Sequence, residues 1–160
     1  MNKNFLKLLT GLAALFLVLI LADVGNAQRR ARGRNYTKAQ VDRIIKNVEE
    51  RTDRFVSQFN DSLDRSRLDG TKREDNLNER ARNLESATDE LRRDFDRRDR
   101  WIENKDEVRR CLNIAADINV VMRNRKFNRA TENNWANVRN ELNVLARVYN
   151  LPVIGSGVYR

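Results

Sequence analysis

The side chains that most often carry out chemistry are scarce in this sequence of 160 residues. Histidine, the commonest general base and metal ligand, is absent. The carboxylates form no ligand pattern, because Asp61, Asp64 and Asp69 lack the spacing of an EF-hand loop and a di-metal bundle would need inward-facing Glu-x-x-His motifs. We therefore expect no catalytic residue, no metal or cofactor site and no small-molecule substrate. The alternative, an enzyme, would need a pocket holding carboxylates of perturbed pKa.

Cys111 is the only thiol, so the chain cannot form an internal disulfide. It stands between Val108 and Leu112 on the apolar side of an expected helix, whereas a reactive thiol is exposed beside a base or a positive charge. We predict a buried core cysteine. The alternative is a disulfide between two chains, because an unpaired thiol is unusual in a secreted protein.

Basic residues are in excess, 32 against 23 acidic, and two clusters of them are candidates for binding anions. The first is an arm without acidic residues, whose arginines are Arg29, Arg30, Arg32 and Arg34. In an exported protein this arm could bind lipopolysaccharide, teichoic acid, acidic polysaccharide or extracellular DNA. It could equally be a solvating tail.

The second cluster lies at the expected turn between the last two helices and surrounds Phe127. Its members are Arg123, Arg125, Lys126 and Arg129. Cations near a helix C-terminus interact favourably with the helix dipole, which would explain Arg123 and in part Arg125 without a ligand. Phe127 could staple the following helix or contact a bound partner.

Residues 1–27 have the pattern of a secretory signal peptide. Lys3 and Lys7 precede an apolar run from Leu8 to Ala22, and small residues at Gly25 and Ala27 mark a cleavage site. The alternative is an uncleaved anchor, although the run is shorter than the about 20 residues that span a bilayer. We predict cleavage near Ala27 and a periplasmic or secreted bacterial protein with no stable membrane span afterwards.

The elements that must position these residues are predicted from apolar periodicity. Between Thr71 and Ile102, apolar residues recur at alternating steps of four and three, and only Arg98 is out of line. This pattern predicts one long amphipathic helix with Trp101 and Ile102 sealing its end. Such a helix cannot bury its apolar stripe alone, so it needs partner helices.

Three further amphipathic helices are expected, over residues 37–67, 105–123 and 130–149. Capping boxes are predicted at Thr37 with Gln40 and at Thr71 with Glu74. Short links between the helices favour an all-α, antiparallel up-down four-helix bundle with two long and two shorter helices. The expected organisation is a signal peptide (1–27), a basic disordered arm (28–36), the bundle (37–150) and an apolar, glycine-broken tail (151–160) able to fold back along it.

The unequal helix lengths predict that the tip of the first hairpin overhangs the shorter pair. The first two helices should be about 43–45 Å long and the last two about 28–30 Å, at 1.5 Å per residue. The apolar side chains at this tip are Phe59, Leu63, Leu68 and Leu77. With few partners within the chain they would form an exposed patch for a protein partner or a homodimer.

Two stretches of the chain carry a resemblance. Ser66 to Asp75 at the hairpin turn and Trp135 to Arg139 in the last helix are similar to uncharacterised secreted bacterial all-helical proteins, which implies no activity. A weaker likeness is to the Spy-type periplasmic helical chaperones, whose Leu-Thr-x-x-Gln motif is echoed once, from Tyr36 to Gln40. The first position departs from that motif and no second copy occurs.

The sequence therefore predicts a non-enzymatic, exported helical protein that acts by surface interaction with envelope components or a protein partner. An anionic envelope polymer fits the basic excess, and nucleic acid is not the expected partner. The alternative is a periplasmic holdase-like stress chaperone, which would need an exposed apolar concavity ringed by positive charge.

Overall fold

The computed structural model describes residues 36–155, which form an all-α four-helix bundle. The helices are α2 (Lys38–Asp64), α3 (Lys72–Arg97), α4 (Lys105–Asn124) and α5 (Arg129–Val148), with a short 3₁₀ helix, η1 (Trp101–Asn104), before α4. The predicted fold class is confirmed. The predicted signal peptide, the four arm arginines and the last five residues of the tail lie outside the described residues.

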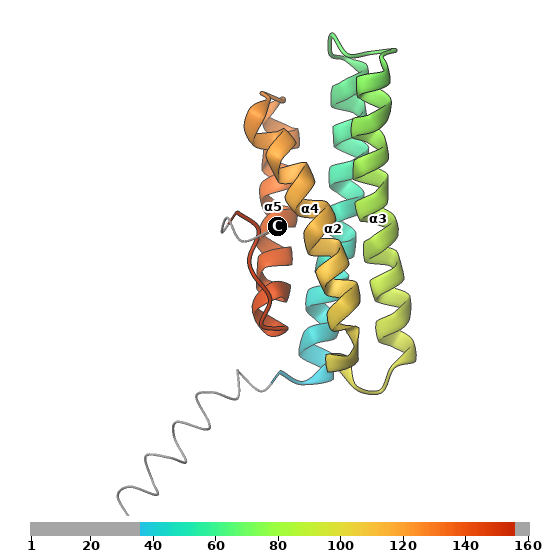
Figure 1. Cartoon of the computed structure of the whole chain (residues 1–160), viewed down its shortest axis with the longest axis vertical. Coiled ribbons are helices and arrows are strands. Elements are labelled where there is room, and N and C mark those ends of the chain that lie inside the picture. The colour runs from blue at the N-terminus through green and yellow to red at the C-terminus, as the bar shows by residue number, and fades with distance from the viewer. Residues whose placement is uncertain (1–35, 156–160) are drawn as a thin grey trace, which may run out of the picture. The chain divides into compact units, whose positions relative to one another are not determined.

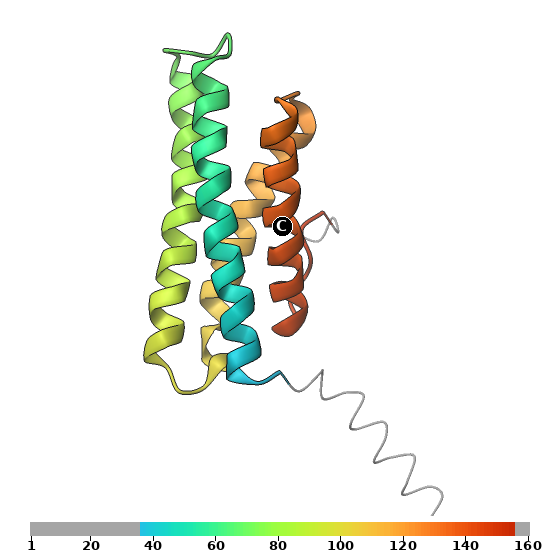
Figure 2. The same cartoon turned by 180° about the vertical axis from the view of Figure 1, so that it is seen from behind.

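Each helix packs against its neighbours in the sequence, and α5 returns to α2. This cyclic arrangement is the expected up-down topology, with α2 and α5 side by side (Figures 1 and 2). The helices have 27, 26, 20 and 20 residues in chain order. As a result the α2–α3 link (residues 65–71) extends beyond the α4–α5 link (residues 125–128), as Figure 1 shows.

The core is built from the apolar stripes that the periodicity predicts. Aromatic rings join α2 to α5 in the core. The ring centroid of Phe55 lies 5.2 Å from that of Phe59 on the same helix and 5.1 Å from that of Trp135 on α5. Burying an aliphatic or aromatic side chain of this size contributes about 1.5–3 kcal/mol, which no isolated helix could obtain. Other fully buried members are Val41, Ile45, Leu84, Leu91, Phe95, Leu112, Leu142 and Leu145.

The helix starts agree with the predicted caps. Thr37 and Gln40 form a complete capping box, with both reciprocal hydrogen bonds present. The second box is only half formed: the Glu74 N–H donates to Thr71 Oγ1 at 3.3 Å, but the Glu74 carboxylate accepts from the Gly70 N–H. Gly70 has a φ of +71°, the left-handed conformation expected for glycine after a helix.

The predicted helix ends need two corrections. α2 ends at Asp64 rather than near Arg67, because the chain tightens and the Ser66 N–H bonds to the Leu63 carbonyl at 2.9 Å. α3 ends at Arg97 rather than at Ile102, because Arg98 is extended (φ −97°, ψ 135°). Ile102 is therefore 44% exposed and does not seal the bundle.

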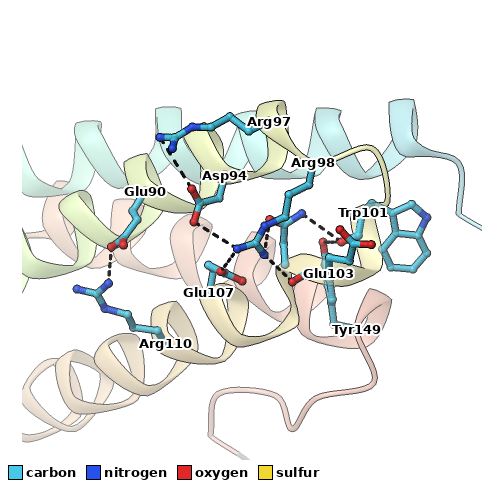
Figure 3. A network of polar contacts seen from close by, with 10 residues as sticks. Glu90, Asp94, Arg97, Arg98, Trp101, Glu103, Glu107, Arg110 and Tyr149 are labelled. Carbon is cyan, nitrogen blue, oxygen red and sulfur yellow. Dashed lines mark hydrogen bonds and ion pairs between the residues drawn. The ribbon is translucent and has the colours of Figure 1, made fainter.

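The α3–α4 corner is held by polar contacts instead. The Arg98 guanidinium donates to the Glu103 carbonyl and to Glu107 and lies 3.7 Å from Asp94 (Figure 3). The Tyr149 hydroxyl donates to the Trp101 carbonyl at 2.8 Å, and the two rings meet edge to face. These contacts tie the end of α3, η1 and the end of α5 together.

The described part of the tail folds back along α5, in agreement with the sequence. Asn150 has a φ of +52° and ends the helix with Pro152 close behind. Ile154 is buried, and its N–H donates to Asn143 Oδ1 at 2.7 Å. Within residues 36–155, no helix combines the length and apolar character that crossing a bilayer requires.

Candidate functional site

The apolar tip expected to be exposed is largely covered within the single chain. Phe59, Leu63 and Leu77 are buried, and Leu68 is half-buried. The cover comes in part from the α4–α5 link, since the Phe127 ring centroid lies 5.2 Å from that of Phe59. The prediction of an exposed apolar patch is therefore wrong for three of its four residues, although the tip does extend beyond the shorter helices.

Beside this tip lies a hollow of about 680 Å³, which we call the basic hollow. One wall comes from the end of α2 and the α2–α3 link, and the other from the α4–α5 link and the start of α5. Its lining residues are Gln58, Ser62, Leu63, Arg65, Ser66, Arg67, Leu68, Arg125, Lys126, Phe127, Asn128 and Ala130. Two segments about 60 positions apart in the sequence thus meet at one site.

The charge of the basic hollow is uniformly positive. Arg65, Arg67, Arg125 and Lys126 are among the lining residues, and none of the lining residues is acidic. Arg65 makes only a long, exposed pair with Asp61, at 3.9 Å. Among residues 36–155, no carboxylate forms an ion pair with any of the other three cations.

Hydrogen bonds hold the two walls in place. Asn128 caps α5 by accepting from the Thr131 N–H at 2.9 Å, and its Nδ2 donates across the hollow to Ser62 Oγ at 3.0 Å. The Thr131 hydroxyl also donates to the Gln58 carbonyl of α2 at 3.3 Å. One N-cap residue therefore begins the last helix and fixes it against α2.

The predicted basic cluster is only partly brought together. Arg125 and Lys126 line the basic hollow together with the adjacent Phe127, whereas Arg123 and Arg129 are exposed and do not line it. The other candidate cluster, Arg29 to Arg34, lies outside the described residues.

Sequence reasoning missed Arg65 and Arg67. They stand among Asp61, Asp64 and Asp69, so the local charge gave no sign of a basic site. The only available signal was the unequal length of the helices, which predicts that the α4–α5 link stops short of the hairpin tip and so lies against the side of the longer pair.

Carboxylates gather elsewhere, on the outer surface of α2 and α3. Burial, opposed by Arg92, raises the pKa of Glu49, and burial together with nearby acids raises the pKa of Asp53 and Glu85. Among the described residues, no His, Cys, Asp and Glu side chains gather closely enough to hold a metal ion. The acidic surface and the basic hollow give the bundle two regions of opposite charge.

Comparison with protein-family models, with curated proteins and with solved structures finds no match for this chain. Function must therefore be argued from the site itself. The basic hollow offers cations, hydroxyls and two amides around the half-buried side chains of Leu68 and Phe127. Such a lining can hold an anion, and it contains neither a thiol nor a carboxylate for covalent or acid–base chemistry.

Proposed function

We propose that this protein is a non-enzymatic, exported binding protein that attaches to an anionic component of the bacterial envelope through the basic hollow. The observation that carries the proposal is the convergence of Arg65, Arg67, Arg125 and Lys126 around one depression without a lining carboxylate. Like charges gathered together destabilise a fold slightly, so a ligand that neutralises them gains affinity, and among the described residues only the long, exposed pair of Arg65 with Asp61 is in place to be broken.

Export is part of the proposal and rests on the sequence. The basic stretch before the apolar run and the small residues before Gln28 support a cleaved signal, which would place the bundle in the periplasm or outside the cell. The arm from Arg29 to Arg34 would then follow the cleavage site directly and add a second, separate attraction for polyanions.

The chaperone alternative has less support. A holdase needs a broad apolar surface, whereas in the basic hollow Leu63 is fully buried, Leu68 and Phe127 are only partly accessible, and the exposed Ala130 adds a single methyl group. The large hydrophobic residues that are exposed in the described chain, Ile102 and Val120, lie on different elements and form no common surface.

The test is co-sedimentation of the purified protein with an isolated bacterial envelope fraction. Arg125→Gln/Lys126→Gln removes an arginine and a lysine from the basic hollow. Arg43→Gln/Lys46→Gln, on the exposed face of α2, is a matched control that removes the same two charges elsewhere. We expect the first variant to lose about tenfold in affinity at low salt and the control to bind within about twofold of wild type.

The salt dependence of binding provides a second measurement. Binding should weaken as salt rises, and the slope should be shallower for the hollow variant than for the control, because fewer counterions are released. Equal losses in the two variants would show that only net charge matters and would overturn the proposal. Substituting Arg29, Arg30, Arg32 and Arg34 together, in a separate variant, measures the contribution of the arm.

A further inference from the structure

The basic hollow continues along the surface between α2 and α5. Gln58 and Ala130 line it and also line a second, shallower depression of about 560 Å³. Arg54 and Asn134 belong to that depression and also to a third, small one of about 40 Å³ beyond it. The shared residues join the three into one groove that follows the seam where α2 and α5 lie side by side (Figure 2).

This groove is long for a site that would hold a single ion. From Arg51, which lines the far depression, to Leu63, which lines the basic hollow, α2 rises by about 18 Å at 1.5 Å per residue. An elongated ligand can contact both ends at once, and simultaneous contacts along one molecule add their free energies.

The chemistry changes along the groove. In the second and third depressions, half of the lining residues are Ala130, Asp53, Arg51 and Arg54. The other half are neutral and polar, namely Ser57, Gln58, Asn134 and Asn137. Hydroxyl and amide groups both donate and accept hydrogen bonds, so they match a ligand that carries many hydroxyls. No hydrogen bond within residues 36–155 uses the side chains of these four residues.

Asp53 gives the second depression a negative charge, which disfavours ligands that are negatively charged at every unit. It lines the second depression, next to Arg54. Arg54 makes only a long, exposed pair with Glu50, at 3.8 Å, and donates to that residue's carbonyl, whereas Arg51 is paired with Glu141 at 3.1 Å. Three carboxylates thus stand against two arginines, and a polymer with a charge on every unit would place an anion beside the Asp53 carboxylate, which is unfavourable.

We propose that the groove binds a linear acidic glycan in which charged sugars are separated by neutral ones. An acidic group lies in the basic hollow, and a neutral, hydroxyl-bearing stretch runs along the α2–α5 seam past Asp53. This inference rests on the proposed function and specifies its ligand. Nucleic acid fits less well, because single strands bind on exposed aromatic faces and Phe127, the one aromatic residue of the lining, packs on Phe59.

The experiment compares two probes in a titration such as calorimetry at constant salt. One is a hyaluronan oligosaccharide, in which acidic and neutral sugars alternate, and the other is inorganic polyphosphate, which is charged at every unit. Asn134→Ala/Asn137→Ala removes two amides from the groove. The matched control, Asn133→Ala/Asn140→Ala, removes two exposed amides of α5 that do not line it.

We expect the groove variant to lose at least about fivefold in affinity for hyaluronan, with the control unchanged, because two hydrogen-bonding amides are removed from the groove. Polyphosphate affinity should be unaffected by either change. Asp53→Asn should strengthen polyphosphate binding a few-fold and leave hyaluronan binding nearly constant. Thermal melts of all variants establish that they are folded.

The outcomes separate the two proposals. If Arg125→Gln/Lys126→Gln weakens both probes but Asn134→Ala/Asn137→Ala weakens neither, the basic hollow is an anion site and the glycan inference is overturned. If the groove variant and its control weaken hyaluronan equally, the inference also fails. If the hollow variant changes nothing, the proposed function itself is wrong.

Discussion

At the scale of single residues, the clearest agreement between sequence and structure is Cys111. Its place between Val108 and Leu112 predicted a core position, and the thiol is free and fully buried. Burial raises the pKa of this thiol to about 12, with a smaller opposing effect from Arg110. A buried protonated thiol is unreactive, which argues against the alternative of a disulfide between chains.

The raised pKa of Cys111 predicts a loss of stability in alkali. The folded state holds the thiol proton more tightly than the unfolded chain, so its stabilising effect is complete below pH 9.0 and is lost as the pH rises toward about 12. One pKa unit corresponds to about 1.4 kcal/mol, so the total loss is on the order of 4 kcal/mol. Urea unfolding at pH 7 and pH 11 measures the part of this loss that occurs below pH 11, about 3 kcal/mol.

Cys111→Ala is the control for this prediction. The variant is less stable at neutral pH because it leaves a small cavity, but it should lose less stability between pH 7 and pH 11 than the wild type does. Tyr149, whose pKa is also raised chiefly by burial, keeps its own contribution in both proteins. Equal pH dependence in the two proteins would contradict the assigned role of the thiol.

At the scale of elements, helix existence and pairing could be predicted, whereas two helix ends could not. Periodicity reports which residues face the core, and Phe95 and Trp101 both pack there although the helix stops between them. The end is decided by Arg98, whose guanidinium turns toward Glu107 on α4. Arg98, a polar residue within an apolar stripe, was the sequence signal for this helix end. Its partner Glu107 can be identified only once α3 and α4 are packed together.

The α2–α3 link supplies a prediction at this scale. Gly70 has a φ of +71°, where a side chain is strained even though an added Cβ would meet no atom within 4 Å. Gly70→Ala should therefore lower the free energy of unfolding by about 1–2 kcal/mol, and Gly70→Asn by less, because asparagine tolerates this conformation. Urea denaturation checks the order; an alanine variant as stable as wild type would contradict it.

At the scale of the whole molecule, the sequence predicted the overhang of the first hairpin but not what covers it. Helix lengths can be estimated from the apolar periodicity of the sequence, so two long and two shorter helices could be predicted directly. The hairpin tip is covered in part by the Phe127 ring, and the contact of this ring with Phe59 joins segments that are distant in the sequence. The same meeting of segments places Arg65 and Arg67 opposite Arg125 and Lys126, which local patterns could not indicate.

Because the side chains of the hairpin tip are buried, substitutions there should cost as much unfolding free energy as substitutions in the core. Leu63→Ala should cost about 2–5 kcal/mol of unfolding free energy, because the side chain is fully buried. Ile102→Ala removes a comparable side chain that is 44% exposed and should cost about 1 kcal/mol or less. Chemical denaturation of both variants measures the two losses. A Leu63 variant as stable as the Ile102 variant would contradict the burial of the tip and support the exposed apolar patch.

The central claim is that cations from two distant segments act as one anion site. A double-mutant cycle on polyphosphate binding, using Arg67→Gln, Lys126→Gln and the double variant, tests it most directly. We predict that each single variant weakens binding and that the two effects are not additive, with a coupling of about 0.5 kcal/mol or more. Additive effects, or no effect from either substitution, would contradict the account.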